Sequence, residues 1–119
     1  TVQEDDLIDL VANIMDWKQV KDIPVENAKG ELVGLMTAGI LVNYLCKTTR
    51  ERWLNSRIRD FMIKNPVSVS PETSISDALK TMIEEKTSCL TVVHNKKLVG
   101  MVTDRHFVKV SAKLIRDLK

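Results

Sequence analysis

The sequence predicts a mixed α/β (α+β) fold made of two copies of one β-α-β-β-α unit. Three observations support this prediction: the chain matches itself at a nearly constant offset, each copy alternates short β-branched runs with amphipathic segments, and the composition is that of a globular domain. Apolar residues make up 44% of the 119 positions but aromatic residues only 4%, so we expect a largely aliphatic core. A chain of this length buries on the order of two thirds of its unfolded surface, so it can fold without disulfides or a structural metal.

An internal repeat relates the two halves of the chain. A shift of 67 positions, and of 66 after a one-residue gap, brings them into register. The identical pairs are Val2/Val69, Ile8/Ile75, Met15/Met82, Val25/Val92, Leu32/Leu98, Val33/Val99, Gly34/Gly100, Thr37/Thr103 and Val42/Val108. Because they fall on the apolar period and on one Gly-x-x-Thr step, they indicate two copies of one structural unit.

Each copy begins with a short strand and an amphipathic helix. The strands are predicted at residues 1–3 and 67–69. Polar residues then mark the helix starts: Thr73 or Ser74 is a plausible N-cap, and Asp5, Asp6 and Asp77 place negative charge where the helix dipole favours it. Apolar residues follow at spacings of three, four and seven, which predicts one buried helical face of about three turns. These residues are Leu7, Ile8, Val11, Ile14 and Met15 in the first copy, and Ile75, Ala78, Leu79 and Met82 in the second.

A hairpin and a second helix complete each copy. The predicted strands are 23–25 and 32–36, then 89–93 and 98–102, with polar turns at 27–30 and 94–97. The closing helices are expected at 38–47 and 105–118. The segment 48–64 contains no Gly or Pro, so we predict a helical crossover that ends in a short amphipathic turn.

The predicted domain organisation is a first repeat at residues 1–47, a crossover at 48–57 and a second repeat at 58–119. A unit of about 45 residues with one three-stranded sheet would be marginally stable alone. We therefore expect the two repeats to pack through their sheets with pseudo-two-fold symmetry.

Charge and cysteine content narrow the function classes. Residues 1–58 carry 7 basic and 9 acidic side chains, whereas residues 59–119 carry 11 and 7. Lys96 and Lys97 form only a two-residue basic cluster without stacking aromatics, which argues against nucleic-acid binding. Cys46 and Cys89 lack zinc-ligand spacing and predict buried free thiols in a reducing cytoplasm.

Targeting signals are not evident in the sequence. No apolar stretch approaches the roughly 18 residues of a membrane span, and no signal-peptide pattern is present. The chain opens on a predicted strand without an initiating Met, so we expect a segment of a longer protein.

Four stretches carry a resemblance to a known family: 58–62, 65–69, 76–82 and 98–105. At these residues the chain resembles a tandem pair of CBS domains, the regulatory module named after cystathionine beta-synthase and also called a Bateman module. The second copy matches along its full length, and the first matches from residue 1 to about 45 but lacks the short turn that precedes the first strand. The resemblance implies a non-catalytic module that binds AMP, ADP, ATP or S-adenosylmethionine between its repeats. It also implies a flat homodimer and an attached effector domain.

The ligand pattern of that family is Gly-x-x-Thr/Ser-x-x-Asp. The first copy carries Gly34 and Thr37 but has Ile40 at the Asp position; the second carries Thr103 but has His106 there. The resemblance implies that the threonines help to hold phosphate or ribose. Ile40 cannot accept a hydrogen bond, and neutral His106 can accept only one. Losing these contacts could cost roughly 1.5 to 3 kcal/mol, or about one to two decades of affinity.

The other candidate ligand residues also have structural interpretations. Asp104 and Arg105 follow Thr103, and Pro66 and Val67 precede the first strand of the second repeat. Arg105 is either a phosphate contact or a solvated helix residue. His106 is either a structural substitution or a pH-sensitive contact. Both threonines are also natural N-caps, a role that is compatible with ligand contact.

Two functional hypotheses remain open from the sequence: a ligand-sensing regulatory module, and a structural or dimerising module whose pockets have decayed. An enzyme is disfavoured, because Cys89 and His94 have no third group beside them, and we predict no catalytic or metal-binding residues. Dimerisation through the helices would use apolar residues on the closing helices. These are Leu41, Tyr44 and Leu45 in the first repeat, and Phe107, Val110 and Leu114 in the second.

Overall fold

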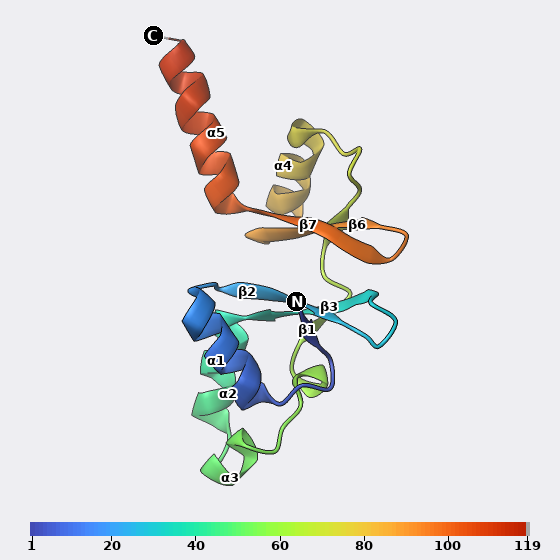
Figure 1. Cartoon of the computed structure of the whole chain (residues 1–119). Coiled ribbons are helices and arrows are strands. Elements are labelled where there is room, and N and C mark those ends of the chain that lie inside the picture. Colours follow the sequence, from blue (N-terminus) through green and yellow to red (C-terminus); the bar gives the residue numbers. More distant parts are fainter. Residues whose placement is uncertain (119) are drawn as a thin grey trace. The chain divides into compact units, whose positions relative to one another are not determined.

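The computed structural model describes residues 1–118, without the side chains of Val110 and Leu114, and it divides into two compact units (Figure 1). Unit 1 is Thr1–Pro66 and unit 2 is Val67–Lys119. Each unit contains one small sheet and helices, which confirms the predicted mixed α/β class. Val110 and Leu114, expected on a dimer face, thus lie outside the described side chains.

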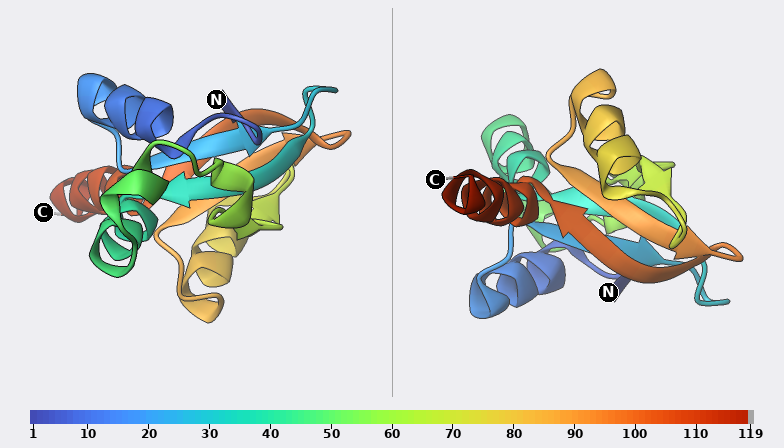
Figure 2. Two further views of the ribbon diagram at one scale, coloured as in Figure 1. Left: turned by 90° about the horizontal axis from the view of Figure 1, so that it is seen from below. Right: turned by 90° about the horizontal axis from the view of Figure 1, so that it is seen from above.

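Unit 1 holds a four-stranded sheet in the order β1-β2-β3-β4. Its elements are β1 (Val2–Gln3), α1 (Ile8–Lys18), β2 (Asp22–Glu26), β3 (Leu32–Thr37), α2 (Ala38–Lys47), α3 (Arg50–Trp53), the 3₁₀ turn η1 (Ile58–Asp60) and β4 (Ile63–Lys64). Strand β1 runs parallel to β2, whereas β2, β3 and β4 are antiparallel neighbours. Helices α1 and α2 lie on one side of this sheet (Figures 1 and 2).

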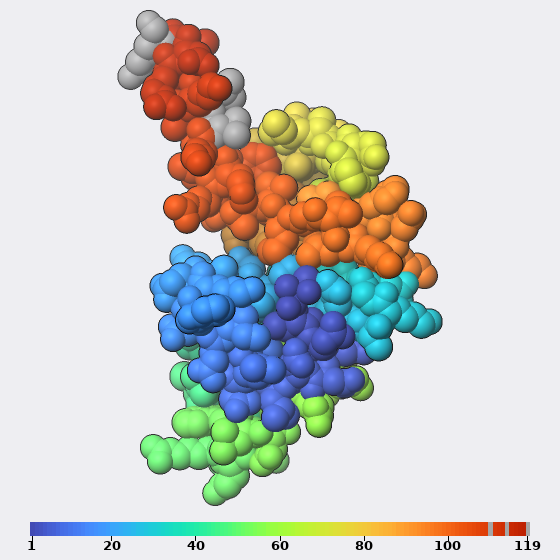
Figure 3. Space-filling view, in the orientation of Figure 1, coloured from blue at the N-terminus to red at the C-terminus, as the bar shows by residue number. Residues whose placement is uncertain are grey.

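Unit 2 repeats this plan with a three-stranded sheet in the order β5-β6-β7. Its elements are β5 (Ser68–Val69), α4 (Ile75–Glu84), β6 (Cys89–His94), β7 (Lys97–Thr103) and α5 (Asp104–Asp117). Helices α4 and α5 cover one side of the sheet, and the C-terminal half of α5 projects beyond the rest of the unit (Figure 3).

Strand register confirms that the two units are copies of one design. Val2 pairs with Val25 in unit 1, and Val69 pairs with Val92 in unit 2. Val25 also pairs with Gly34, and Val92 pairs with Gly100. In both hairpins the strand register shifts immediately after the valine. The sequence offset of 67 and then 66 therefore reflects equivalent backbone positions.

The one-residue gap in the repeat falls in the hairpin turns. In unit 1, the Asn27 side chain accepts hydrogen bonds from the backbone N–H groups of Lys29 (2.9 Å) and Glu31 (3.0 Å), and Gly30 adopts a φ of 76°. In unit 2, Asn95 and Lys96 form a two-residue turn with φ values of 51° and 65°. Two positive φ values in a two-residue loop match the twist of a hairpin, so the shorter connection suffices.

The crossover differs from its prediction. Only Arg50–Trp53 is α-helical, followed by the η1 turn and by β4. Ile63 and Lys64 pair with Leu35 and Gly34 instead of continuing a helix, because the outer edge of β3 offers unpaired backbone groups. The expected short turn corresponds to η1, and the crossover before it is α-helical only at Arg50–Trp53.

Side-chain hydrogen bonds attach the crossover to α2. The Tyr44 hydroxyl lies 2.5 Å from the Arg52 carbonyl oxygen and 2.6 Å from Ser56 Oγ, and the Trp53 indole N–H donates to Thr48 Oγ1 at 3.0 Å. Phe61 contacts the Tyr44 ring edge-on, with 4.6 Å between the ring centroids. Tyr44 is therefore a core residue, and its expected place on an exposed dimer face is wrong.

The compact units and the sequence repeat divide the chain at different points. The second sequence repeat begins at residue 58, yet Ile58 lies in the core of unit 1 and β4 belongs to its sheet. The compact units meet at Pro66 and Val67. The segment that introduces the second repeat in the sequence thus completes the first unit in space.

Candidate functional site

Thr37 and Thr103 occupy equivalent junctions between the last hairpin strand and the closing helix. Each is the N-cap residue of its helix, with extended φ values of −124° and −118°. The first helical amide is fixed in the same way in both units: Ala38 N–H donates to the Lys21 carbonyl at 2.8 Å, and Asp104 N–H donates to the Ser88 carbonyl at 3.0 Å. The two junctions therefore share one backbone frame.

Both threonines cap their helices, and the second junction has an additional side-chain bond. Thr37 Oγ1 accepts a hydrogen bond from the Ile40 backbone N–H at 3.2 Å, which confirms its capping role. In unit 2, Thr103 and His106 form a capping box: the Thr103 side chain accepts from the His106 backbone N–H, and the Thr103 backbone N–H donates to Nδ1 of His106 at 3.0 Å. Thr103 Oγ1 also lies 3.1 Å from that nitrogen. The imidazole thus takes the place of the acidic or amide side chain in a capping box.

His106 has one ring nitrogen committed and one available. Because Nδ1 accepts the Thr103 N–H, that nitrogen carries no proton in this arrangement. The neutral ring then carries its hydrogen on Nε2, and the residue is exposed. His106 therefore helps to cap α5 and presents Nε2 as a donor, whereas a carboxylate at this position would present acceptors.

The remaining candidates divide between the two units. Asp104 and Arg105 are exposed on the first turn of α5. The Val67 carbonyl accepts from both the backbone N–H and the hydroxyl of Thr91, each at 3.1 Å, and Thr91 is wholly buried. Thr37 and Pro66 belong to unit 1, whereas Val67 and Thr103 to His106 belong to unit 2.

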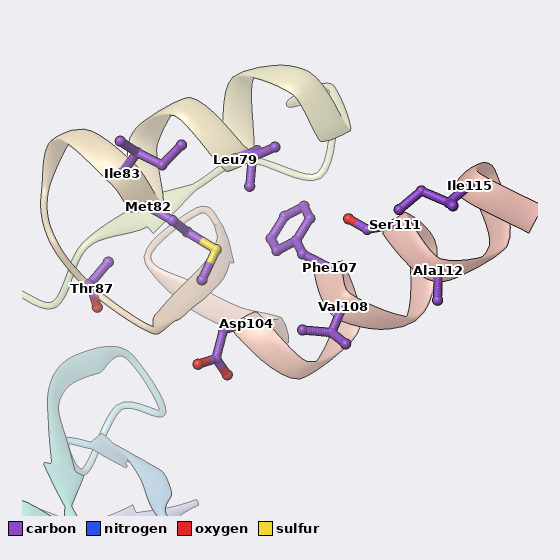
Figure 4. A pocket seen from close by; sticks show the side chains of 10 residues that line it. All are labelled: Leu79, Met82, Ile83, Thr87, Asp104, Phe107, Val108, Ser111, Ala112 and Ile115. Carbon is purple, nitrogen blue, oxygen red and sulfur yellow. The ribbon is translucent and has the colours of Figure 1, made fainter.

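Two cavities in unit 2 lie beside these residues. The first, which we call the α4–α5 groove, has a volume of about 550 Å³ and a mostly apolar lining (Figure 4). Its lining residues are Leu79, Met82, Ile83, Thr87, Asp104, Phe107, Val108, Ser111, Ala112 and Ile115. Figure 4 shows the Phe107 ring between the two helices, facing Leu79 and Met82.

The second cavity, the β5–α4 pocket, has a volume of about 280 Å³ and includes His106 in its wall. The other lining residues are Val69, Ser70, Pro71, Thr73, Ile75, Ala78, Val92, Val102 and Phe107. The sequence placed these residues in a strand, a helix start and a core, and it gave no signal that they enclose a cavity.

Other reactive groups are dispersed. Cys89 is buried and Cys46 is exposed, so only one of the two thiols is buried as predicted; both are free. His94 is exposed at the β6–β7 hairpin. Within residues 1–118 no three His, Cys, Asp or Glu side chains gather as metal ligands would, and none of the helices described there is both long and apolar enough to cross a membrane.

Comparison with known proteins connects this geometry to a family. The CBS domain family matches residues 58–113. Inosine-5′-monophosphate dehydrogenase of Korarchaeum cryptofilum is 38% identical over 64 residues, which are 52% of this chain and 13% of the dehydrogenase. The chain spans between 13% and 38% of the lengths of the first curated relatives it matches.

Solved structures share the fold over almost the whole chain. The crystal structure of CBSX2 in complex with AMP superposes with a TM-score of 0.81 at 25% identity, covering 96% of this chain and 87% of CBSX2. The CBS domain pair of protein MJ0100, in complex with 5′-methylthioadenosine and S-adenosylmethionine, gives a TM-score of 0.80 at 19% identity, with 92% and 87% coverage. The family match, the repeated strand register and these structures together identify the chain as a tandem CBS module.

Proposed function

We propose that this chain is a regulatory module that senses an adenosine-containing ligand, AMP, ADP, ATP or S-adenosylmethionine, and controls an effector domain attached to it in a longer protein. The candidate contacts are Thr37, Pro66, Val67, Thr103, Asp104, Arg105 and His106. We also place the protein in the cytoplasm, where its free thiols stay reduced.

The observation that carries the proposal is the duplicated strand-to-helix junction. Thr37 and Thr103 both cap a helix whose first amide is bonded to an equivalent carbonyl, at Lys21 or Ser88. A helix N-terminus favours negative charge, so each junction suits a phosphate. The AMP complex of CBSX2 and the CBS modules of longer enzymes support the same interpretation.

We assign the stronger site to the second repeat. Arg105 is exposed beside Thr103 and supplies positive charge, and residues 59–119 carry 11 basic against 7 acidic side chains. In the first repeat, Ile40 offers no polar side-chain atom, and Gly39 occupies the position equivalent to Arg105. An anionic ligand therefore gains more from the Thr103 junction than from the Thr37 junction.

A structural or dimerising role is the alternative, and it is favoured by the absence of an acidic residue at position 40 or 106. We propose that the module forms a homodimer through its helices, for which the α4–α5 groove provides an apolar surface in unit 2. Ile83, Val108 and Ile115 are all exposed around this groove. Light scattering at micromolar concentration should give the mass of a dimer, and a monomer would contradict the dimer proposal.

Thermal-shift scanning tests the sensing proposal. AMP, ADP, ATP, S-adenosylmethionine and cyclic dinucleotides are each added at millimolar concentration, because any ligand that binds the native state must raise its melting temperature. We expect stabilisation by at least one adenosine compound, lost in Thr103→Val and retained in Thr37→Val. No stabilisation by any compound would leave the structural role, and the reverse dependence on the two threonines would overturn the site assignment.

A further inference from the structure

His106 faces two hydrogen-bonding groups of Thr103 with a single ring nitrogen. Nδ1 accepts the Thr103 backbone N–H at 3.0 Å and lies 3.1 Å from Thr103 Oγ1. A backbone N–H can only donate, whereas a hydroxyl can donate or accept. The first group therefore requires Nδ1 without a proton, and the second can bond to Nδ1 with or without one.

The bond from the Thr103 N–H exists only while the imidazole is neutral. When histidine takes up a proton, both ring nitrogens carry hydrogen and neither can accept. The Nδ1–H of His106 can then donate to Thr103 Oγ1, but the Thr103 N–H loses its acceptor. Histidine changes its charge between about pH 5 and 8, so this exchange falls in the physiological range.

The charges on α5 oppose protonation of His106. The residue lies in the first turn of α5, where the helix dipole is positive. Arg105 precedes it and Lys109 lies about one turn further along, and both are exposed. Asp104 is the carboxylate of this turn, but it lines the α4–α5 groove, whereas His106 lines the β5–α4 pocket.

Among the described residues, no titratable group faces His106 from the neighbouring elements across this pocket. The other lining residues come from β5, the β5–α4 loop, α4, β6, β7 and α5, and none has a titratable side chain. Glu72 in that loop and Asp77 in the first turn of α4 are exposed and do not line the pocket. The surroundings of the ring therefore offer no carboxylate that would stabilise its charged form.

We propose that His106 is a proton switch at the start of α5. The neutral ring accepts the Thr103 N–H and completes the capping box, and the protonated ring releases that N–H. The unfolded chain holds neither bond, so it binds the proton more readily than the native chain, and acid lowers the stability of unit 2. In unit 1 the equivalent residue is Ile40, so the cap of α2 has no titratable partner.

The group that the switch releases belongs to the candidate ligand site. In acid, the Thr103 N–H becomes available to an anionic ligand, and the imidazolium adds positive charge beside Arg105. This consequence rests on the proposed function. The switch itself needs no ligand and can be observed in the complete chain alone.

NMR of the unliganded chain tests the switch at the bond itself. The Thr103 amide resonance should shift between about pH 8 and 5 with the same midpoint as the His106 ring resonances. In His106→Gln, the side-chain oxygen accepts the same N–H at every pH, as in an ordinary capping box, so the Thr103 resonance should stay constant. His94→Gln is the matched control, because it removes the other, exposed histidine and should leave the Thr103 titration unchanged.

Urea unfolding gives a second, independent measurement. Between about pH 8 and 5.5, the unfolding equilibrium constant of the wild type should rise about three- to tenfold more than that of His106→Gln, as expected for one hydrogen bond. His94→Gln should behave like the wild type. The proposal is overturned if the Thr103 amide does not follow the His106 titration, or if acid destabilises the wild type and His106→Gln equally. An intact Thr103 titration without binding of any adenosine compound would uphold the switch and count against the proposed function alone.

Discussion

Units 1 and 2 share one strand register but differ in how their cores are completed. Unit 1 buries a cluster of nine residues that includes Ile58 from the crossover, whereas the corresponding described cluster of unit 2 consists of Ala78, Met82 and Leu90. Unit 1 also has a fourth strand, β4, and the one-turn helix α3. The difference shows that a β-α-β-β-α repeat fixes topology by itself but needs an added segment to close its apolar layer.

The candidate sites of the two units differ in a similar way, at the equivalent positions 40 and 106. In unit 1, residue 40 is an isoleucine that packs against the core, and Thr37 caps its backbone. In unit 2, residue 106 is an exposed histidine that takes part in the cap and also lines a cavity. The second copy therefore has a polar side chain beside a cavity at the position where the first copy has a packed apolar side chain.

The largest effect should come from truncating the crossover anchor. Ile58→Ala removes a fully buried side chain and should lower the free energy of unfolding by about 2 to 5 kcal/mol. Ile75→Ala, at an exposed position of unit 2, should change it by less than about 0.5 kcal/mol. Denaturant unfolding followed by circular dichroism measures both, and equal effects would show that the two layers are closed alike.

The repeat glycines should respond to alanine in opposite ways. A Cβ at Gly34 would lie 3.0 Å from the Ile63 carbonyl oxygen and 2.9 Å from Met62 Cγ, because β4 packs beside it. A Cβ at Gly100 would have Val92 Cβ at 3.9 Å as its nearest neighbour. We expect Gly34→Ala to destabilise by about 1 to 3 kcal/mol and Gly100→Ala to be neutral or stabilising by up to about 1 kcal/mol.

This glycine comparison also tests the placement of β4. If Gly34→Ala and Gly100→Ala have the same effect on the denaturation midpoint, the close approach of the crossover to β3 does not persist in solution.

A carboxylate introduced at position 106 or 40 should affect ligand binding differently in the two repeats. His106→Asp supplies two acceptors for ribose hydroxyls and should tighten AMP binding by about tenfold, which corresponds to one charge-assisted hydrogen bond of about 1.4 kcal/mol. Ile40→Asp should have a smaller effect, because the first repeat lacks a counterpart of Arg105 and has Gly39 there. Isothermal titration calorimetry compares the two variants, and a larger gain in Ile40→Asp would assign the main site to the first repeat.

Much of the fold was predictable because each helix and strand of the repeat occurs twice, so two sequence patterns indicate the same element. The bounds of α2 and the topology of both hairpins follow from apolar spacing and turn residues, and the structure confirms them. The crossover was not predictable, since residues 58–64 are apolar at intervals that suit a helical turn or a strand. Their conformation is decided by tertiary partners, namely the open edge of β3 and the layer around Ile8.

The candidate site was predictable in its backbone but not in its side-chain bonding. The Gly-x-x-Thr step correctly placed Thr37 and Thr103 at helix starts. It could not show that His106 would accept the Thr103 N–H, because that bond depends on the rotamer of one side chain. Nor could it show the β5–α4 pocket, where Ala78 and Val102 are smaller than the equivalent residues of unit 1.

We propose that an adenosine-containing ligand binds the second repeat in preference to the first. Amide chemical shifts followed by NMR during a titration compare the two junctions residue by residue. With AMP or S-adenosylmethionine added at millimolar concentration, we expect the largest saturable shifts at Thr103, Asp104, Arg105 and His106, and smaller shifts at Thr37 and Ile40. Saturable shifts confined to the Thr37 junction, or none at either junction, would overturn the proposed preference for the second repeat.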